Sequence, residues 1–275
     1  MKKLAILSIS LLIFVFLAGC VNQSDGGESG IGVVIKSFTA LPTTTEPKMP
    51  VLLQLDIQNS GGTVAGNVTA DLLGLTYEWS VSPQRTQDIG ELYPSDPSRG
   101  IAQGEERIIE WDLSAPGKTR DIPYSATAHV SYTYTTTLEA EIKAVTYDYL
   151  RQTGETGGIS FQGTSTGPLL IKIIASSTVI SGGRIPVQVQ IQNTGGGHVN
   201  GNKLTLDLGS TKDLSCSRTI VTLIGGKTAS LYCTLQVGSE PFTNYKIFPI
   251  SISTSYSYWI ERTTSITVLK TPVSA

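Results

Sequence analysis

The sequence is poor in the residues from which most enzyme and metal sites are built. It has two histidines, three cysteines and two methionines among 275 residues, and charged side chains make up only 15% of the chain. The histidines, His129 and His198, have no cysteine or carboxylate beside them at metal-ligand spacing. The two isolated histidines do not indicate a catalytic triad or a histidine general base, and no Gly-x-Ser-x-Gly motif supplies a nucleophilic serine. We therefore expect no enzymatic activity, no metal site and no cofactor.

Charge of one sign is not concentrated anywhere in the chain. Lys and Arg total 20 against 22 Asp and Glu, and the lack of a basic patch argues against nucleic acid as a partner. Carboxylates gather at Asp88 and Glu91 and again at Glu105 and Glu106, in segments expected to be loops. Such clusters are usually solvated, so we expect no binding site there.

The N-terminus has the features of an export signal. Lys2 and Lys3 precede an apolar stretch from Leu4 to Ala18, which is too short to span a bilayer comfortably. The stretch leads into Leu-Ala-Gly-Cys20, which resembles a lipobox: the small residues fit a peptidase cleft and the cysteine thiol accepts the lipid. The alternative is an ordinary signal peptide with an incidental cysteine.

This pattern predicts where the protein is located. Residues 1–19 are expected to be a signal peptide, and the polar, glycine-rich residues 20–30 a flexible tether. The protein would be exported and held by a lipid on Cys20, at the outer face of the cytoplasmic membrane or at the cell surface. About 255 residues would remain after cleavage, which suits two domains of ordinary size.

An internal repeat organises the mature chain. Residues 51–62 match residues 187–196, and both segments end in Gln-Asn-(Ser/Thr)-Gly-Gly. The segments that follow, 66–74 and 201–209, also match, and order and spacing are retained. Two copies of roughly 100–120 residues make tandem domains, since solenoid repeats are much shorter.

Each copy has the pattern of β-strands. Apolar residues alternate with glutamines over residues 187–192, which is the period-2 signature of a strand with one buried face. Asn and Gly in the turns accept positive φ. Further strands are expected over 107–113, 122–134 and 138–145. Many short strands between Gly and Pro turns predict all-β Greek-key sandwiches.

The domain boundaries follow from these patterns. We assign residues 31–148 to a first β-sandwich and 168–270 to a second. Residues 149–167 are rich in Gly, Thr and Ser with little periodicity, so they are expected to form a linker.

The strand that ends in Gln-Asn-(Ser/Thr)-Gly-Gly, followed by a Gly-Asn turn, resembles the immunoglobulin-like modules of prokaryotic surface proteins. CARDB-type modules and archaeal S-layer-associated repeats are the most similar, and the resemblance covers both domains. The acidic, asparagine-rich ending usual in CARDB modules is missing. The resemblance implies adhesion, scaffolding or spacing at the envelope, with another envelope protein or a surface glycan as partner. The alternative is an accessory lipoprotein of a transport, secretion or pilus-like machine.

Two further features concern polar side chains that could bind or be modified. A tyrosine stripe could form a sugar- or peptide-binding surface, although the face it continues is apolar, which favours the sandwich interior. This stripe consists of Tyr132, Tyr134, Tyr256 and Tyr258. Asn22 and Asn67 lie in glycosylation sequons that an exported chain could use.

The two remaining cysteines are expected to form a disulfide. Cys216 and Cys233 are equidistant from a turn at residues 224–225, and an exported chain meets oxidising conditions. Alignment of the copies places Trp79 at the position of Cys216 and Trp111 at that of Cys233, which predicts a Trp79–Trp111 contact in the first domain. The alternative is two free thiols and two unrelated tryptophans.

We expect replacement of the lipid acceptor, Cys20→Ser, to release the protein or to leave its signal peptide uncut. A single acyl chain anchors only weakly, so Cys20 should carry more than one chain or a diether lipid. Membrane fractionation and intact-mass measurement test this. Unchanged processing and membrane retention in the variant would contradict it.

Overall fold

The computed structural model describes residues 32–175, 183–209, 211, 213–238 and 242–271. The expected signal peptide, Cys20 and Asn22 lie outside these residues. Within the described ranges, no helix has the length and apolar character needed to cross a membrane.

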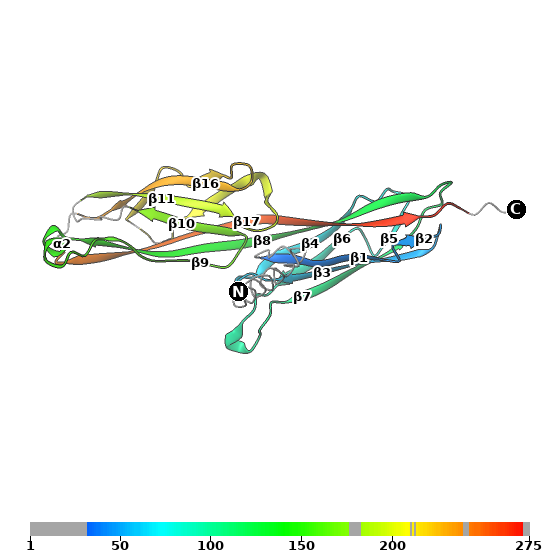
Figure 1. Cartoon of the computed structure of the whole chain (residues 1–275), viewed down its shortest axis with the longest axis horizontal. Coiled ribbons are helices and arrows are strands. Elements are labelled where there is room, and N and C mark those ends of the chain that lie inside the picture. The colour runs from blue at the N-terminus through cyan, green and yellow to red at the C-terminus, as the bar shows by residue number, and fades with distance from the viewer. Residues whose placement is uncertain (1–31, 176–182, 210, 212, 239–241, 272–275) are drawn as a thin grey trace, which may run out of the picture.

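The described chain is almost entirely β-structure, arranged in two small sheets and one large sheet (Figure 1). The first small sheet has the order β1 (Val33–Leu41), β3 (Pro50–Asn59), β7 (Glu106–Ser114) and β5 (Ser80–Ser82). The second has the order β10 (Leu169–Ala175), β11 (Arg184–Asn193), β16 (Thr228–Gln236) and β14 (Leu214–Cys216).

The nine-stranded sheet has the central order β15 (Ile220–Thr222), β13 (Lys203–Asp207), β17 (Tyr245–Val268), β8 (Ile122–Val145), β4 (Ala65–Leu73) and β6 (Thr86–Leu92). Three short strands join it outside this path: β2 (Thr44–Thr45), β9 (Gly158–Thr164) and β12 (His198–Val199). Within the described residues, the helices are η1 (Pro97–Arg99), α2 (Tyr147–Thr153) and η2 (Asn200–Asn202). The all-β sandwich class predicted from the sequence is confirmed.

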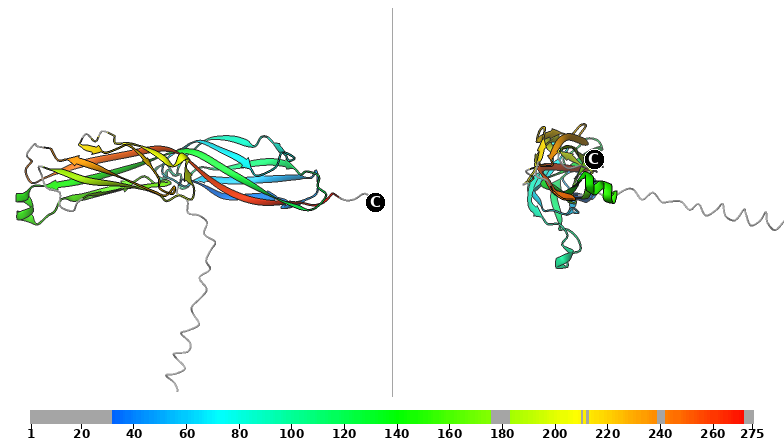
Figure 2. Two further views of the ribbon diagram at one scale, coloured as in Figure 1. Left: turned by 90° about the horizontal axis from the view of Figure 1, so that it is seen from above. Right: turned by 90° about the vertical axis from the view of Figure 1, so that its left-hand side faces the viewer.

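The two longest strands, β8 and β17, run the length of the molecule. Each has 24 residues, and they pair antiparallel from Ile122 opposite Val268 to Val145 opposite Tyr245. One face of β8 is buried throughout, against the first small sheet in its first half and the second small sheet in its second half. Figure 2 shows the resulting elongated body, in which the two sandwiches lie end to end.

This continuity corrects the strand and linker predictions. The strands expected over 122–134 and 138–145 are one strand, because the alternation passes through Thr136, which is buried and shares a hydrogen bond with Tyr256. The segment 149–167 holds the end of α2 and all of β9, which pairs with β8. Each sandwich is also completed by the far half of the other copy's long strand, so the two copies interlock.

The two copies are related by a local two-fold arrangement. Asn59 and Asn193 end equivalent strands, and each side chain accepts a bond from the backbone two residues on and donates to a carbonyl four residues on. The Tyr132 hydroxyl accepts a hydrogen bond from Val33 N, and the Tyr256 hydroxyl accepts one from the backbone of Leu169. The predicted equivalence of Asn59 with Asn193 and of Tyr132 with Tyr256 is therefore confirmed.

The disulfide prediction is confirmed. Cys216 on β14 lies directly opposite Cys233 on β16, with Cα atoms 3.9 Å apart and a bond between the sulfurs. The chain-entropy estimate for a closed loop of this size is about 3 kcal/mol.

The tryptophan prediction is only half right. Trp111 pairs with Leu53 as Cys233 pairs with Val187, so Trp111 does occupy the position of Cys233. The register of β5 with β7, however, pairs Ser80 with Ser114 and Ser82 with Asp112, so Trp79 lies beyond the Ser114 end of this ladder and not opposite Trp111. The alignment that placed Trp79 at the position of Cys216 was therefore wrong.

The tryptophan rings accordingly have other neighbours. The Trp79 ring packs edge-on against Tyr124, with centroids 5.3 Å apart. The Trp111 ring packs against Phe38 at 6.3 Å and donates a hydrogen bond to Gln84 O.

The conserved role of the two turn asparagines gives a test of the internal symmetry. Asn59→Ala and Asn193→Ala each remove side-chain bonds to buried backbone groups, so each should lower the free energy of unfolding by about 2–4 kcal/mol. Urea denaturation measures the loss, with the exposed Gln190→Ala on β11 as control. A loss below about 0.5 kcal/mol in either variant would contradict the assigned role.

Candidate functional site

The centre of the molecule, where β8 and β17 cross the local two-fold, carries polar groups on both faces of the large sheet. On the inner face, four tyrosine side chains are between 1% and 6% exposed. Tyr132 stands opposite Tyr258 and Tyr134 opposite Tyr256. Of the two interpretations left open by the sequence, the stripe belongs to the core.

The tyrosine hydroxyls are held by the turns of both copies. The Tyr134 hydroxyl accepts a bond from Thr63 N and donates to Thr166 O. The Tyr258 hydroxyl accepts from Gly197 N and donates to the Asn193 side chain. The hydroxyls of Tyr134 and Tyr258 therefore bind the central turns of the sandwiches.

Burial changes the acidity of two of these tyrosines. It raises the pKa of the Tyr132 hydroxyl well above its usual value, with the neighbouring tyrosines adding to the effect. It raises the pKa of Tyr256 as well, although the hydrogen bond with Thr136 opposes the shift. Both groups therefore remain neutral donors and acceptors across the physiological range.

The outer face of the same region is hollowed into a depression of about 460 Å³. Strands β4, β8 and β17 form its floor, and η2 contributes to its wall. Its lining consists of Asn67, Thr69, His129, Ser131, Tyr132, Thr133, Asn200, Ser257, Tyr258 and Trp259. None of these ten residues carries a permanent charge.

Trp259 is the large aromatic side chain of this depression, and both histidines flank it. The His198 ring stacks on the indole with centroids 4.5 Å apart, and the His129 ring lies at 5.1 Å. His129 Nδ1 is 2.8 Å from Glu261 Oε1. The sequence placed the two histidines in separate domains, and no sequence pattern linked them to Trp259. They come together because β12, which carries His198, and β8, which carries His129, both pair with β17, which carries Trp259.

Hydroxyl and amide groups surround the rings of Trp259, His129 and His198. Thr69 and Ser131 share a hydrogen bond of 2.8 Å, and Thr133 donates to Gly66 O. Asn67, the sequon residue, is exposed at the edge of the depression with a φ of 50°. Among the described residues, no group of three or more His, Cys, Asp or Glu could hold a metal ion.

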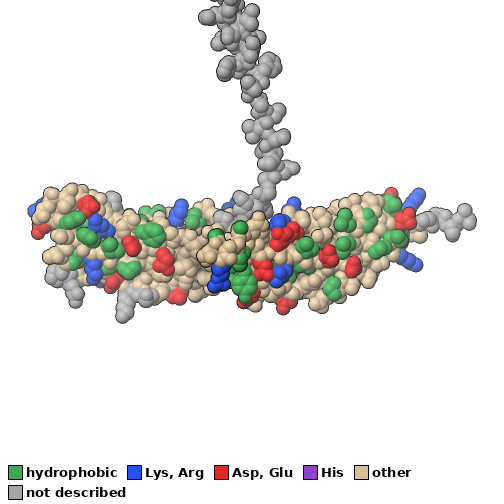
Figure 3. Space-filling view, turned by 90° about the horizontal axis from the view of Figure 1, so that it is seen from below, with side chains coloured by type: hydrophobic (Ala, Val, Ile, Leu, Met, Phe, Trp, Pro, Cys, Tyr) green, Lys and Arg blue, Asp and Glu red, His purple; other side chains and the backbone are tan. Residues whose placement is uncertain are grey.

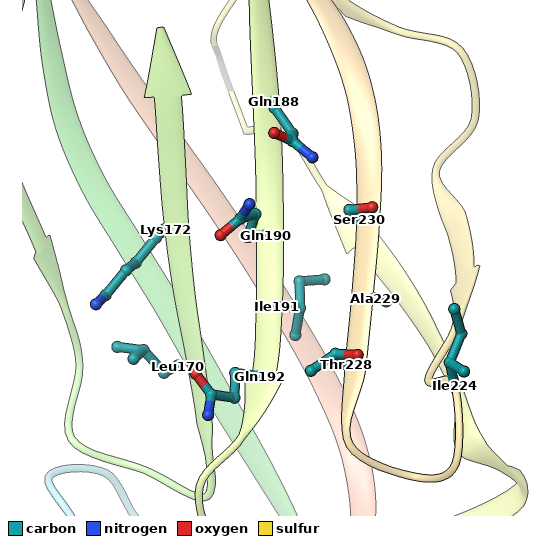
Figure 4. Close-up of a pocket in the computed structure, with 10 residues that line it drawn as sticks. All are labelled: Leu170, Lys172, Gln188, Gln190, Ile191, Gln192, Ile224, Thr228, Ala229 and Ser230. Atoms are coloured by element: carbon teal, nitrogen blue, oxygen red, sulfur yellow. The ribbon is translucent and has the colours of Figure 1, made fainter.

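A second hollow, of about 280 Å³, lies on the outer face of the second small sheet. Figure 4 shows Gln188, Gln190 and Gln192 following one another along β11, with Lys172 on β10 and Ser230 on β16 beside them. These side chains alternate with buried residues, as on any solvated sheet face. No aromatic side chain lines the second hollow, so it is the weaker candidate for a binding site.

Asp88 and Glu91 lie on strand β6 and not in the expected loop, and they accept hydrogen bonds from Gly90 N and the Tyr93 hydroxyl. The Glu105–Glu106 cluster forms ordinary surface ion pairs. Lys36 Nζ lies 2.8 Å from Glu106 Oε2, and this hydrogen bond lowers the pKa of Glu106. Glu105 pairs with Arg107. On the face drawn in Figure 3, acidic and basic side chains intermingle and hydrophobic side chains form small separate patches.

Comparisons with known proteins leave the family open. No protein-family model and no curated protein matches the chain. Solved structures with some likeness include the D0-D1 domain of intimin, at 10% identity and a TM-score of 0.22, covering 86% of this chain and 99% of that one. The secreted serine protease VesC from Vibrio cholerae follows at 11% identity and a TM-score of 0.23, covering 86% and 51%.

The CupB6 tip adhesin from Pseudomonas aeruginosa has 8% identity and a TM-score of 0.16, with 89% of this chain and 98% of that one covered. TM-scores this low support no conclusion about function. The resemblance to CARDB-type and S-layer-associated modules stays a prediction.

The buried tyrosines predict a loss of stability in alkali. Because their pKa values are higher in the folded chain than in the unfolded chain, the folded state keeps protons that the unfolded state releases above pH of about 10. The free energy of unfolding should then fall with pH, by at most about 1.4 kcal/mol per pH unit for each tyrosine. Urea unfolding at several pH values should show a shallower decline for Tyr132→Phe and Tyr256→Phe. The exposed Tyr77→Phe is the control, and equal slopes for all variants would contradict the assignment.

Proposed function

We propose that this protein is a lipid-anchored component of the cell envelope that holds two interlocked β-sandwiches as one rigid body outside the membrane. It would serve adhesion, binding or spacing there, without enzymatic activity. The lipid on Cys20 would be its attachment to the membrane.

The observation that carries this proposal is the uninterrupted pairing of β8 with β17. Tandem domains joined by a linker bend at the linker. Here one antiparallel ladder of 24 residue pairs runs without interruption from one sandwich into the other. At about 3.3 Å per residue, each strand is about 80 Å long. A body of this kind keeps two distant ends in a fixed relation, which is the property required of a spacer or a scaffold.

The point at which the tether joins the body supports a crosswise orientation, in which the long axis of the body lies parallel to the membrane. Gly32 O accepts a hydrogen bond from Ser60 N, and Val33 N donates to the Tyr132 hydroxyl at the two-fold. The chain therefore enters the rod near its middle and not at a tip. Cys20 is twelve residues before Gly32, a distance that spans at most about 40 Å when extended. Both tips would then lie at similar heights above the membrane.

Single cysteines at the two tips test this proposal. Arg120→Cys precedes the start of β8 and Gln152→Cys lies in α2 beyond its end, and both positions are exposed. With Cys20 lipidated and Cys216 bonded to Cys233, the wild type has no free thiol and is the matched control.

Intact cells treated with a membrane-impermeant maleimide should be labelled at both tips, to a similar extent, and not in the wild type. The reason is that a rod held at its middle exposes both ends. Absence of labelling at both tips in intact cells, with labelling after lysis, would contradict display outside the membrane. Labelling of one tip alone would contradict the crosswise orientation.

A further inference from the structure

We propose that the depression around Trp259 is a saccharide-binding site for a neutral sugar. The inference deepens the proposed function by naming the class of ligand, and it rests on that function only in that saccharides are met outside the membrane. Two sources could supply the sugar: a glycan of the cell surface, or a glycan attached to this chain at Asn67.

The first reason is the placement of Trp259. The outer face of β8 and β17 otherwise carries mostly hydroxyl and charged side chains, whereas Trp259 is partly exposed there beside two imidazoles. Indole and imidazole offer apolar faces with polar edges, which suit the C–H groups of a pyranose ring. Binding sites for small ligands combine such aromatic walls with a few fixed polar groups.

The second reason is the chemistry of the rest of the lining. Hydroxyls of Thr133 and Ser257 and amides of Asn67 and Asn200 surround the aromatic groups, and no Lys, Arg, Asp or Glu is among the ten lining residues. Donors and acceptors without net charge suit a polyhydroxylated ligand. A phosphate or nucleic acid ligand would need cationic partners, which the lining lacks.

The third reason is that the site departs from the internal symmetry. The equivalence of Tyr132 with Tyr256 and of Tyr134 with Tyr258 places Thr135 at the position of Trp259 and Ser253 at that of His129. The aromatic cluster, which takes His129 from the first copy and His198 and Trp259 from the second, therefore has no counterpart at the two-fold-related position, where Thr135 supplies a matched control.

Asn67 connects the two sources of sugar. It heads the sequon Asn-Val-Thr69, it is exposed, and it lines the same depression as Trp259. A glycan on its side chain would begin at the rim of the site. Without that glycan the depression is open to an external oligosaccharide.

Tryptophan fluorescence can separate these cases in the full-length protein. Trp79 and Trp111 are 3% and 0% exposed, so acrylamide quenching reports mainly on Trp259. The first arm purifies the protein from its native membrane in detergent, examines the Asn67 peptide by mass spectrometry, and compares quenching with that of Asn67→Gln. The second arm adds neutral oligosaccharides to Asn67→Gln and measures both protection from quenching and binding on a glycan array.

If the sugar is the chain's own, the Asn67 peptide carries hexose and Trp259 is more strongly quenched in Asn67→Gln. If it is external, an oligosaccharide protects Trp259, binding weakens about tenfold or more in Trp259→Ala, and Thr135→Ala binds as before. Trp259→Phe, which keeps an aromatic face, should retain part of the binding and guards against loss through misfolding.

The proposal is overturned if Asn67 is unmodified and no neutral oligosaccharide protects Trp259, or if binding is the same in Trp259→Ala. It is overturned equally by a glycan on Asn67 that leaves the quenching of Trp259 unchanged. These measurements on purified protein are independent of the cell-labelling test, so a failure here leaves the display function standing, and a failure there leaves the sugar site standing.

Discussion

The antiparallel ladder between β8 and β17 is the constraint on which the rest of the structure depends. Each strand belongs to both sandwiches, so neither sandwich has a complete large sheet without the other copy. The buried residues of both sandwiches form one continuous hydrophobic cluster along the ladder. The outer face of the same ladder carries the depression around Trp259. Stability, shape and the candidate site thus share one set of backbone hydrogen bonds.

The repeated Gln-Asn-(Ser/Thr)-Gly-Gly motif has its explanation at the middle of that ladder. The asparagine amide ties its own turn to the neighbouring loop, and the turn then offers a backbone N–H to a tyrosine hydroxyl. Buried polar groups are costly unless they are paired, and here asparagine, turn and tyrosine satisfy one another. The motif is therefore more than a favourable turn, because it joins the small sheet of each copy to the shared strands.

Much of this fold could be predicted from the sequence, because strand alternation, turn residues and the repeat are local signals. The disulfide could be predicted because Cys216 and Cys233 are equidistant from a turn. The position of Trp111 could be predicted because it aligns with Cys233 within a strand. Strand continuity through Thr136 was missed because a threonine in an apolar face looks like a break, and only its buried partner Tyr256 explains it. The stacking of His129 and His198 on Trp259 joins three strands distant in sequence, and no local pattern encodes such a meeting.

The strand arrangement also determines how the molecule would respond to tension. A pull along the long axis, applied at opposite tips, loads β8 and β17 parallel to their length, so many hydrogen bonds of the ladder must shear together. A pull applied at Gly32 meets instead the short attachments around the two-fold, where Ser60, Val33 and Tyr132 would separate in sequence. The same protein would thus be mechanically strong between its ends and weaker at its middle, where the chain would yield before the rod itself came apart.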